Sequence, residues 1–514
     1  MTGELFAAID VGSYEMALKI FELSNKHGVR ELDHVRHRMD IGSETYASGA
    51  ISNRHVEEMI RILVDFKKIM KGYGVTHYQA YGTSAIRETK DIDIVKDLIE
   101  QRTGIHIDVL SNSEQRFLDY KSIALKHDQF KQIIARPTAI VDIGGGSIQI
   151  SLFEKDTLVA TQNLKTGVLR IHTTMEEVHA TRLKYIDLVS ELVNSQLSVF
   201  SKMHLKDKTL ENLIIIDDYV SPVIQKVKLG SEKMGYATRD EYLKFIEQGS
   251  VMSEIDVAKK LGMPEENVPL LFVSGVLIKC ILDATQATNI WAPGITLCDG
   301  IAYEYAEKKN FIKSPHDFEQ DIIACAQNIS KRFMGSKSRR ETLQRLALTI
   351  FDSTLELHGL SQRDRLLLQI ATILHDCGKY ISVVYLGDCS YNIIMSTEII
   401  GLSHLERLIV ANVVRYNHEE FDYYGSSSYI KDLSREEYLR VAKLTAILRV
   451  ANGLDRTHKQ KFKDVKVFIK GKELVITVDT RADITLEKGL FNNRASFFEG
   501  VYGIRPVIRQ KKML

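Results

Sequence analysis

One short phrase occurs twice in this chain, and it constrains the fold more than any other feature. An apolar run ends in Asp10, a Gly/Ser turn follows, and a second apolar run begins. The same order returns at Asp142. Each copy predicts two strands joined by a tight turn. Two copies predict a duplicated α/β fold whose turns face each other across a cleft.

Both turns are suited to bind an anion. A Gly/Ser turn at a strand end exposes several backbone N–H groups in one concavity, and glycine has no Cβ to block a phosphate oxygen. Hydrated Mg²⁺ prefers one or two carboxylates, so Asp10 and Asp142 are the predicted metal residues. Two ordinary hairpin turns are the alternative interpretation. The predicted phosphate-binding positions in the turns are Gly12, Ser13, Gly144, Gly145, Gly146 and Ser147.

Two further strand ends carry polar side chains. Thr83 and Ser84 end one strand, and Arg87 follows; hydroxyls and a guanidinium suit a second phosphate. The alternative is a helix N-cap with a solvated arginine. Ser111-x-x-Glu114 follows another strand, and Glu114 is a candidate to activate water for attack on a terminal phosphoryl group. A capping box fits the same four residues, and the two roles are compatible.

Together these residues resemble the exopolyphosphatase / guanosine pentaphosphate phosphohydrolase (Ppx/GppA) family, within the actin-like ATPase superfamily of duplicated ribonuclease-H-like folds. Gly167-Val-Leu-Arg170 and the late Asp299-Gly300 extend the match. The resemblance implies Mg²⁺-dependent hydrolysis of the terminal phosphoanhydride of inorganic polyphosphate. Guanosine pentaphosphate or tetraphosphate are the alternative partners. It also implies Glu114 as general base, Arg87 on the phosphate oxygens, and a homodimer.

Three departures from the family pattern leave a second class of function open. Tyr14 follows the first Gly-Ser where the family usually has Asn, and Gln149 stands where it usually has Glu. Asp217-Asp218 replaces a glycine-rich turn, and two carboxylates there would repel phosphate. A catalytically weak protein that senses polyphosphate or an alarmone is therefore the rival hypothesis. A sugar or acetate kinase of the same superfamily is less favoured.

The spacing of the apolar residues changes after the α/β region. Helical periodicity dominates from Arg340 to about Asp455, and the last 55 or so residues alternate as strands again. We expect four domains: two actin-like subdomains, an all-helical HD-like domain and a small α+β domain. Their predicted bounds are 1–125, 126–310, 311–458 and 459–514.

The HD-like domain retains only part of a metal site. Such phosphohydrolases hold metal with a His, a His-Asp pair and a distant Asp. Here His375-Asp376 is present, but Arg339 and Asn452 align with the other two positions. The sequence therefore favours a hydrogen-bonded structural pair over a metal site.

Composition excludes several other classes. The 68 Lys and Arg nearly balance 67 Asp and Glu, so no global field would recruit nucleic acid or a membrane. Five scattered cysteines without a C-x-x-C pair argue against a disulfide framework or a zinc site. The N-terminus lacks the pattern of a signal peptide, and we see no run of about 20 apolar residues. The expected location is the cytoplasm.

Overall fold

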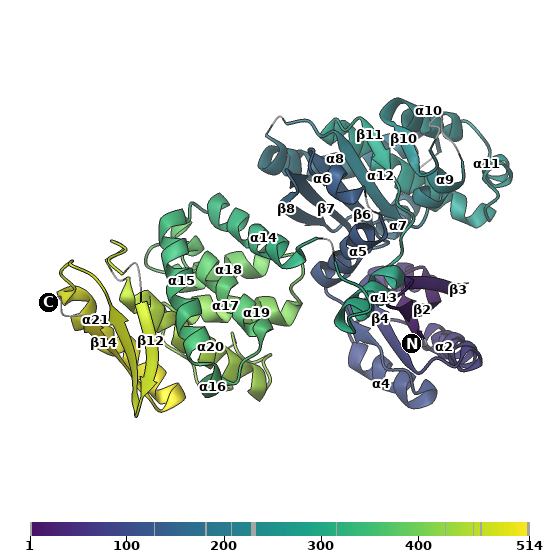
Figure 1. Cartoon of the computed structure of the whole chain (residues 1–514). Helices are drawn as coiled ribbons and strands as arrows, with labels where there is room; N and C mark the ends of the chain where they lie inside the picture. Colours follow the sequence, from purple (N-terminus) through teal and green to yellow (C-terminus); the bar gives the residue numbers. More distant parts are fainter. Residues whose placement is uncertain are drawn as a thin grey trace. The chain divides into compact units, whose positions relative to one another are not determined.

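The computed structural model describes residues 3–127, 129–179, 182–206, 208–227, 233–314, 316–426, 428–455, 457–462 and 465–510. The chain divides into two compact units, Met1–Asp321 and Ile322–Leu514. The first unit contains two β-sheets, and the second contains a helical core and a third, smaller sheet (Figure 1).

The first sheet contains the first copy of the repeated phrase. Its strand order is β3-β2-β1-β4-β5, with β1 antiparallel to β2 and parallel to β4. The parallel ends of β1 and β4 meet at one edge of the sheet, which brings Gly12 and Thr83 to the same place. The strands are β1 (Glu4–Val11), β2 (Glu15–Ser24), β3 (Gly28–Arg38), β4 (His77–Gly82) and β5 (Asp108–Val109).

The second sheet repeats this topology. Its order is β10-β11-β9-β6-β7-β8, with β6 antiparallel to β7 and parallel to β9. The neighbouring strands β8-β7-β6-β9-β11 therefore correspond to β3-β2-β1-β4-β5, and β10 is an addition at the edge beside β11. The repeated phrase predicts this duplication. The strands are β6 (Thr138–Ile143), β7 (Ile148–Glu154), β8 (Thr157–Leu164), β9 (Asn212–Asp217), β10 (Tyr236–Thr238) and β11 (Asn289–Trp291).

Helices cover both faces of the first sheet because its central strand is apolar on both sides. Side chains alternate along a strand. Ala7 and Ile9 pack in the core that includes α2, whereas Phe6 and Ala8 pack against Ile301 of α13 on the other face. The first-unit helices are α1 (Gly42–Ser48), α2 (Asn53–Tyr73), α3 (Ser84–Glu88), α4 (Ile92–Thr103), α5 (Asn112–Lys126), α6 (Phe130–Ile134), α7 (Val168–Glu177), α8 (Arg182–Phe200), α9 (Val220–Lys226), α10 (Arg239–Ser250), α11 (Glu254–Leu261), α12 (Val268–Thr285) and α13 (Leu297–Lys308), with short helical turns at Ser201–Leu205 and Glu265–Asn267.

One described segment, Glu265–Thr285, is long and apolar enough to cross a membrane by length and composition. This corrects the sequence expectation that no such run exists. However, 72% of its most apolar window is buried inside the protein. Leu271 and Leu282 of α12 belong to the same apolar core as Val141 and Ile215 of the second sheet. The packing is that of a core helix.

The second unit combines helices with a three-stranded sheet of order β12-β13-β14. Gly471 has φ of +59° in the turn between β12 and β13, where the sequence predicts a hairpin. The strands are β12 (Val465–Lys470), β13 (Glu473–Val478) and β14 (Arg505–Gln510). The helices are α14 (Phe318–Arg332, which begins in the first unit), α15 (Lys337–Ser353), α16 (Leu355–His358), α17 (Gln362–Leu374), α18 (Leu386–Ser396), α19 (His404–Tyr416), α20 (Arg435–Leu454) and α21 (Thr485–Tyr502), with a 3₁₀ turn at Cys377–Tyr380.

Candidate active site

The two glycine turns adopt the same local structure. The Gly12 N–H donates to the Glu15 carbonyl at 2.9 Å, and the Gly144 N–H donates to the Ser147 carbonyl at 3.0 Å. Each bond closes the turn between a strand whose penultimate residue is Asp and the strand that follows. The duplication thus extends from the topology to the main-chain hydrogen bonds of the turns.

The structure brings the two turns together. A Cβ built on Gly145 would lie 3.2 Å from the Ser13 Cβ, and one on Gly146 would lie 2.8 Å from the Ser84 Oγ. Leu169 donates its N–H to the Gly145 carbonyl at 3.0 Å. Gly145, Gly146 and Ser13, from both predicted phosphate-binding turns, therefore lie together where the two turns meet within the first unit.

Three hydroxyl groups lie where the two turns meet. Ser13 Oγ lies 2.8 Å from the Tyr46 hydroxyl and 3.0 Å from the Ser84 Oγ, and Tyr46 and Ser84 also share a hydrogen bond. Thr83, next to Ser84, donates its N–H to the Val11 carbonyl at 3.1 Å. Tyr46 was not predicted from the sequence, because it stands in α1, more than 30 residues from both serines.

Acidic side chains gather at the strand ends beneath the turns. Asp10 Oδ1 and Asp142 Oδ2 are buried and have no hydrogen-bond partner among the described residues. Burial, then the charges of Asp218 and Glu15, raise the pKa of Asp10 well above its usual value. Loss of hydration and then the charge of Glu15 raise the pKa of Asp218 to about 7. A cation bound here would relieve this repulsion.

These carboxylates fit a hydrated Mg²⁺ ion. The described residues contain no cluster of three His, Cys, Asp or Glu arranged to hold a metal. Mg²⁺ does not need such a cage, because it keeps several waters and takes one or two carboxylates together with phosphate oxygens. The unpartnered oxygens of Asp10 and Asp142 supply those carboxylates.

Arg116 of α5 also occupies this acidic site. Its guanidinium forms an ion pair with Asp142, and its Nη1 lies 3.9 Å from Asp119 Oδ2. A Cβ on Gly144 would lie 3.2 Å from the Arg116 Nη2, so the guanidinium reaches the second turn. The Arg116 side chain is 6% exposed. This buried cation neutralises Asp142, and no motif predicts it.

Glu114 and Arg87 have defined structural partners. The Ser111 N–H donates to Glu114 Oε2 at 2.9 Å, and the Glu114 N–H donates to Ser111 Oγ at 3.2 Å, which completes a capping box. Glu114 precedes Arg116 by two residues, which is about 200° around the helix, so the two side chains leave α5 on nearly opposite sides. Arg87 donates to the Leu110 carbonyl and to Asn112 Oδ1, and so holds the loop before α5.

The three departures from the family pattern acquire structural roles. Tyr14 donates to Asn267 Oδ1 at 3.3 Å and joins the core of the second sheet. Gln149 is buried and donates to Thr161. Asp217 accepts the N–H groups that start α9, and its charge is one of the causes that raise the pKa of Asp218.

In the second unit, an arginine stands in the predicted HD-like site. Arg339 Nη2 donates to Asn452 Oδ1 at 3.2 Å. Burial lowers the pKa of His375 to about 4, with the charge of Arg339 acting in the same direction. His375 Nδ1 lies 2.8 Å from the Thr372 carbonyl, and Asp376 lies 3.6 Å from the Lys379 amine. His375 Nε2 lies 3.7 Å from Asp376 Oδ2 and has no hydrogen-bond partner among the described residues, so the pair is not hydrogen-bonded as predicted. The Arg339 guanidinium cannot ligate a metal, and its bond to Asn452 supports a structural role for this site.

Comparison with known proteins agrees with this geometry. The guanosine-5'-triphosphate,3'-diphosphate pyrophosphatase of Vibrio atlanticus is 20% identical over 452 residues, covering 86% of each chain. Exopolyphosphatase 1 of Mycobacterium tuberculosis is 23% identical over 143 residues, which are 28% of this chain and 40% of that protein.

Structural and profile comparisons extend this likeness. The solved exopolyphosphatase of Cytophaga hutchinsonii matches 59% of this chain and 98% of its own, at 18% identity and a TM-score of 0.51, which supports the fold. The profile of the Ppx/GppA phosphatase family matches residues 20–309, and that of Ppx/GppA phosphatase, domain III, matches residues 323–494. These two matches span most of the sequence, and the chain belongs to the Ppx/GppA phosphatase family.

Proposed function

We propose that this chain hydrolyses the terminal phosphoanhydride bond of inorganic polyphosphate with Mg²⁺. The observation that carries this proposal is the contact between two equivalent glycine turns, above the unpartnered carboxylates of Asp10 and Asp142. Backbone N–H groups take phosphate oxygens without adding a titratable charge. Members of this family are phosphatases, and relatives include proteins named exopolyphosphatase.

In this proposal the chain contributes mainly positioning and charge, as in other phosphoryl transfers. The two turns, with Ser13 and Ser84, hold the terminal phosphate. Mg²⁺ held by Asp10 and Asp142 would neutralise charge that develops on the phosphate oxygens. Arg116 keeps Asp142 from repelling the substrate.

Two further residues prepare the attack of water. Glu114, fixed by its capping box, activates the water molecule. Arg87 acts through the loop that it holds, because its guanidinium bonds to the Leu110 carbonyl and Asn112.

Guanosine pentaphosphate is the second candidate substrate. The relatives that align over most of this chain are named guanosine-5'-triphosphate,3'-diphosphate pyrophosphatases, and one covers 86% of it. The same residues would bind the phosphate chain of either molecule. The distinction therefore needs an assay with both substrates.

The test is phosphate release from polyphosphate and from guanosine pentaphosphate, with and without Mg²⁺. Asp142→Asn should abolish release. Glu114→Gln keeps a side chain that completes a capping box but removes the base, so release should fall by about 100-fold or more with little change in stability. Glu177→Gln, an exposed position on α7, is the matched control.

The outcomes separate the hypotheses. Unchanged turnover in Glu114→Gln would assign Glu114 to helix capping alone. Binding of both substrates by the wild-type chain without any phosphate release would overturn the enzyme proposal in favour of a sensor. The homodimer and the cytoplasmic location stay predictions, and light scattering of the purified chain tests the first of them.

A further inference from the structure

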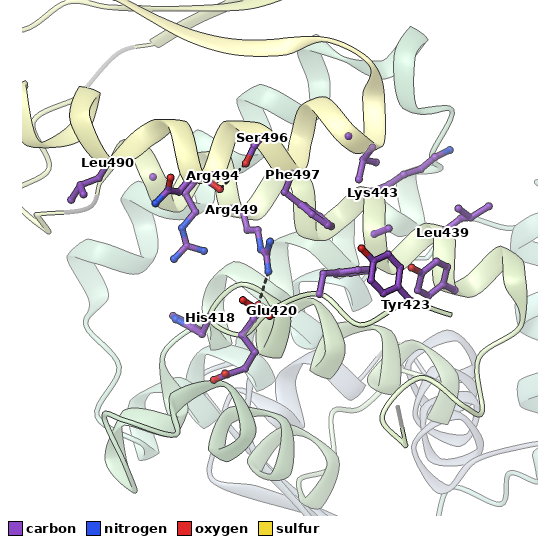
Figure 2. Close-up of a pocket in the computed structure, with 18 residues that line it drawn as sticks. His418, Glu420, Tyr423, Leu439, Lys443, Arg449, Leu490, Arg494, Ser496 and Phe497 are labelled. Atoms are coloured by element: carbon purple, nitrogen blue, oxygen red, sulfur yellow. Dashed lines mark hydrogen bonds between the residues drawn. The ribbon is translucent and has the colours of Figure 1, made fainter. Parts of the chain in front are cut away.

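The second unit contains a cavity of about 1020 Å³, bounded by α20, α21 and the segment that follows α19 (Figure 2). This volume is at the upper end of the range for small-molecule sites. Its lining combines cations, aromatic rings and small polar groups. The cavity lies outside the predicted phosphate-binding residues, and His418 of its lining lies 2.8 Å from the carbonyl of His375 in the predicted HD-like site.

Two arginines from different helices converge in this cavity. Arg449 lies on α20 and Arg494 on α21, and Figure 2 shows both guanidinium groups extending into the space. Arg449 Nε donates to the Tyr416 carbonyl at 2.7 Å, and Arg494 Nη1 donates to the Asn417 carbonyl at 2.7 Å. Arg449 also donates to the Glu419 carbonyl, and these neutral acceptors orient its guanidinium without cancelling its charge.

Nearby carboxylates compensate this charge only in part. Lys443 adds a third cation to the lining, and no described carboxylate forms an ion pair with Lys443 or Arg449. The Glu419 side chain turns to Gly387, where a built Cβ would lie 2.7 Å from its Oε1. Glu420 is exposed. An anion that enters the cavity would therefore meet an excess of positive charge.

The electrostatic environment of Arg449 agrees with this balance. Burial, then the charge of Arg494, lower the pKa of Arg449 to about 10, and Glu420 acts in the opposite direction. Two guanidinium groups that repel each other in a partly buried space are stabilised when an anion binds between them.

Aromatic rings accompany these cations. The Arg449 guanidinium carbon lies 4.5 Å from the centre of the Phe497 ring, and Phe421 lies 4.9 Å from Phe497. Tyr423, at the rim, is 83% exposed. Such rings offer faces for stacking a planar group, which an inorganic phosphate chain lacks.

We infer that this cavity binds a nucleoside phosphate, with Arg449 and Arg494 on the phosphate and the aromatic rings against the base. Guanidinium groups bind phosphate oxygens in a planar fork, which favours a phosphate over a less complementary anion. Every residue in the argument lies in the second unit, so the inference does not depend on the proposed hydrolytic function.

Two glycines on α21 provide a matched test. A Cβ on Gly500 or on Gly489 would meet no atom within 4 Å, but only Gly500 lines the cavity. Gly500→Leu therefore fills the cavity without a clash, and Gly489→Leu makes the same change on the same helix outside it. Both replace glycine in a helix by a better helix former, so neither should destabilise the chain.

The experiment is calorimetric titration of the full chain with ATP and, separately, with inorganic tripolyphosphate, both in EDTA. We expect ATP to bind, and Gly500→Leu and Arg449→Gln each to weaken ATP binding by about tenfold or more. Gly489→Leu should bind ATP like the wild type, and Gly500→Leu should bind tripolyphosphate, through the turns of the first unit, like the wild type. Absence of ATP binding, ATP binding that Gly500→Leu leaves intact, or equal weakening of ATP and tripolyphosphate binding in Gly500→Leu would each overturn the inference.

Discussion

Replacing Arg116 with methionine should lower the free energy of unfolding of the first unit by about 3–5 kcal/mol in Mg²⁺-free buffer, because it leaves a buried carboxylate without its partner. The Arg116 and Asp142 side chains are 6% and 9% exposed, so water cannot replace the ion pair. Asp119 lies close to the same guanidinium, and burial and then Asp142 raise its pKa. The variant would therefore bring two unscreened acids together.

Urea unfolding measures this cost. Trp291 is the only tryptophan in the chain and is 4% exposed in β11, so its fluorescence reports on the first unit. Arg136→Met is the matched control: Arg136 and Glu211 form an ion pair whose side chains are 65% and 37% exposed, and its loss should cost about 0–1 kcal/mol.

The double variant Arg116→Met, Asp142→Asn isolates the pair. Removing both charges should recover about 2 kcal/mol or more of the loss in Arg116→Met alone. Added Mg²⁺ should stabilise Arg116→Met more than the wild type, since the cation then faces an uncompensated Asp142. Two outcomes would refute the view that the Arg116 guanidinium neutralises Asp142 in place of a metal ion. One is a loss of stability no larger than that of Arg136→Met, and the other is equal stabilisation of both proteins by Mg²⁺.

Two further predictions address the turns and the second unit. Gly167→Ala should reduce phosphate release by about 100-fold, because the new Cβ would lie 2.3 Å from the Gly145 carbonyl oxygen and displace the turn; Gly72→Ala, with open space around it, should have no effect. The pKa of His375 is about 4 in the folded chain and about 6.5 for an ordinary histidine, as in the unfolded chain. As the pH falls, the unfolded state therefore binds the proton first. Stability should fall as the pH falls from about 6.5 towards 4, by up to about 1.4 kcal/mol per pH unit, and less steeply in His375→Asn. Unfolding followed by far-UV circular dichroism, with the same slope in both proteins, would contradict this.

The elements predicted from the sequence are those with local apolar periodicity. Apolar alternation over 473–478 predicts a strand and helical spacing over 92–101 predicts a helix, and these match β13 and most of α4. Strands β3 and β8 were not predicted, because both are largely exposed or half-buried edge strands without a clear apolar alternation. The sequence also predicts a strand over 105–110, but β5 has only two residues, since only Asp108–Val109 pairs with β4.

The site was predictable where one short segment carries its chemistry. Asp10 and Asp142 could be singled out because each stands in a recognisable strand and turn, and their role in holding a metal stays a prediction. Arg116 and Tyr46 were not, because their roles arise from contacts with residues more than 25 positions away. The segment Ser111–Glu114 shows that a recognisable motif can leave a role open. Its sequence predicts both a capping box and a catalytic carboxylate, and the structure establishes the capping box.

An arginine lies at each of the two places where the sequence analysis considered a metal site. Asp142, predicted to hold a metal, is paired with Arg116, and Arg339 bonds to Asn452 where an HD-like site would need an acid. A guanidinium keeps its charge at any physiological pH and is tethered to the chain, so it neutralises a carboxylate without capture of an ion from solution. A hydrated metal exchanges water for phosphate oxygens in its coordination shell, and a guanidinium has no such exchangeable ligands. Asp142 is therefore neutralised within the chain in the first unit, and in the second unit Arg339 and Asn452 leave no acid at that position to hold a metal.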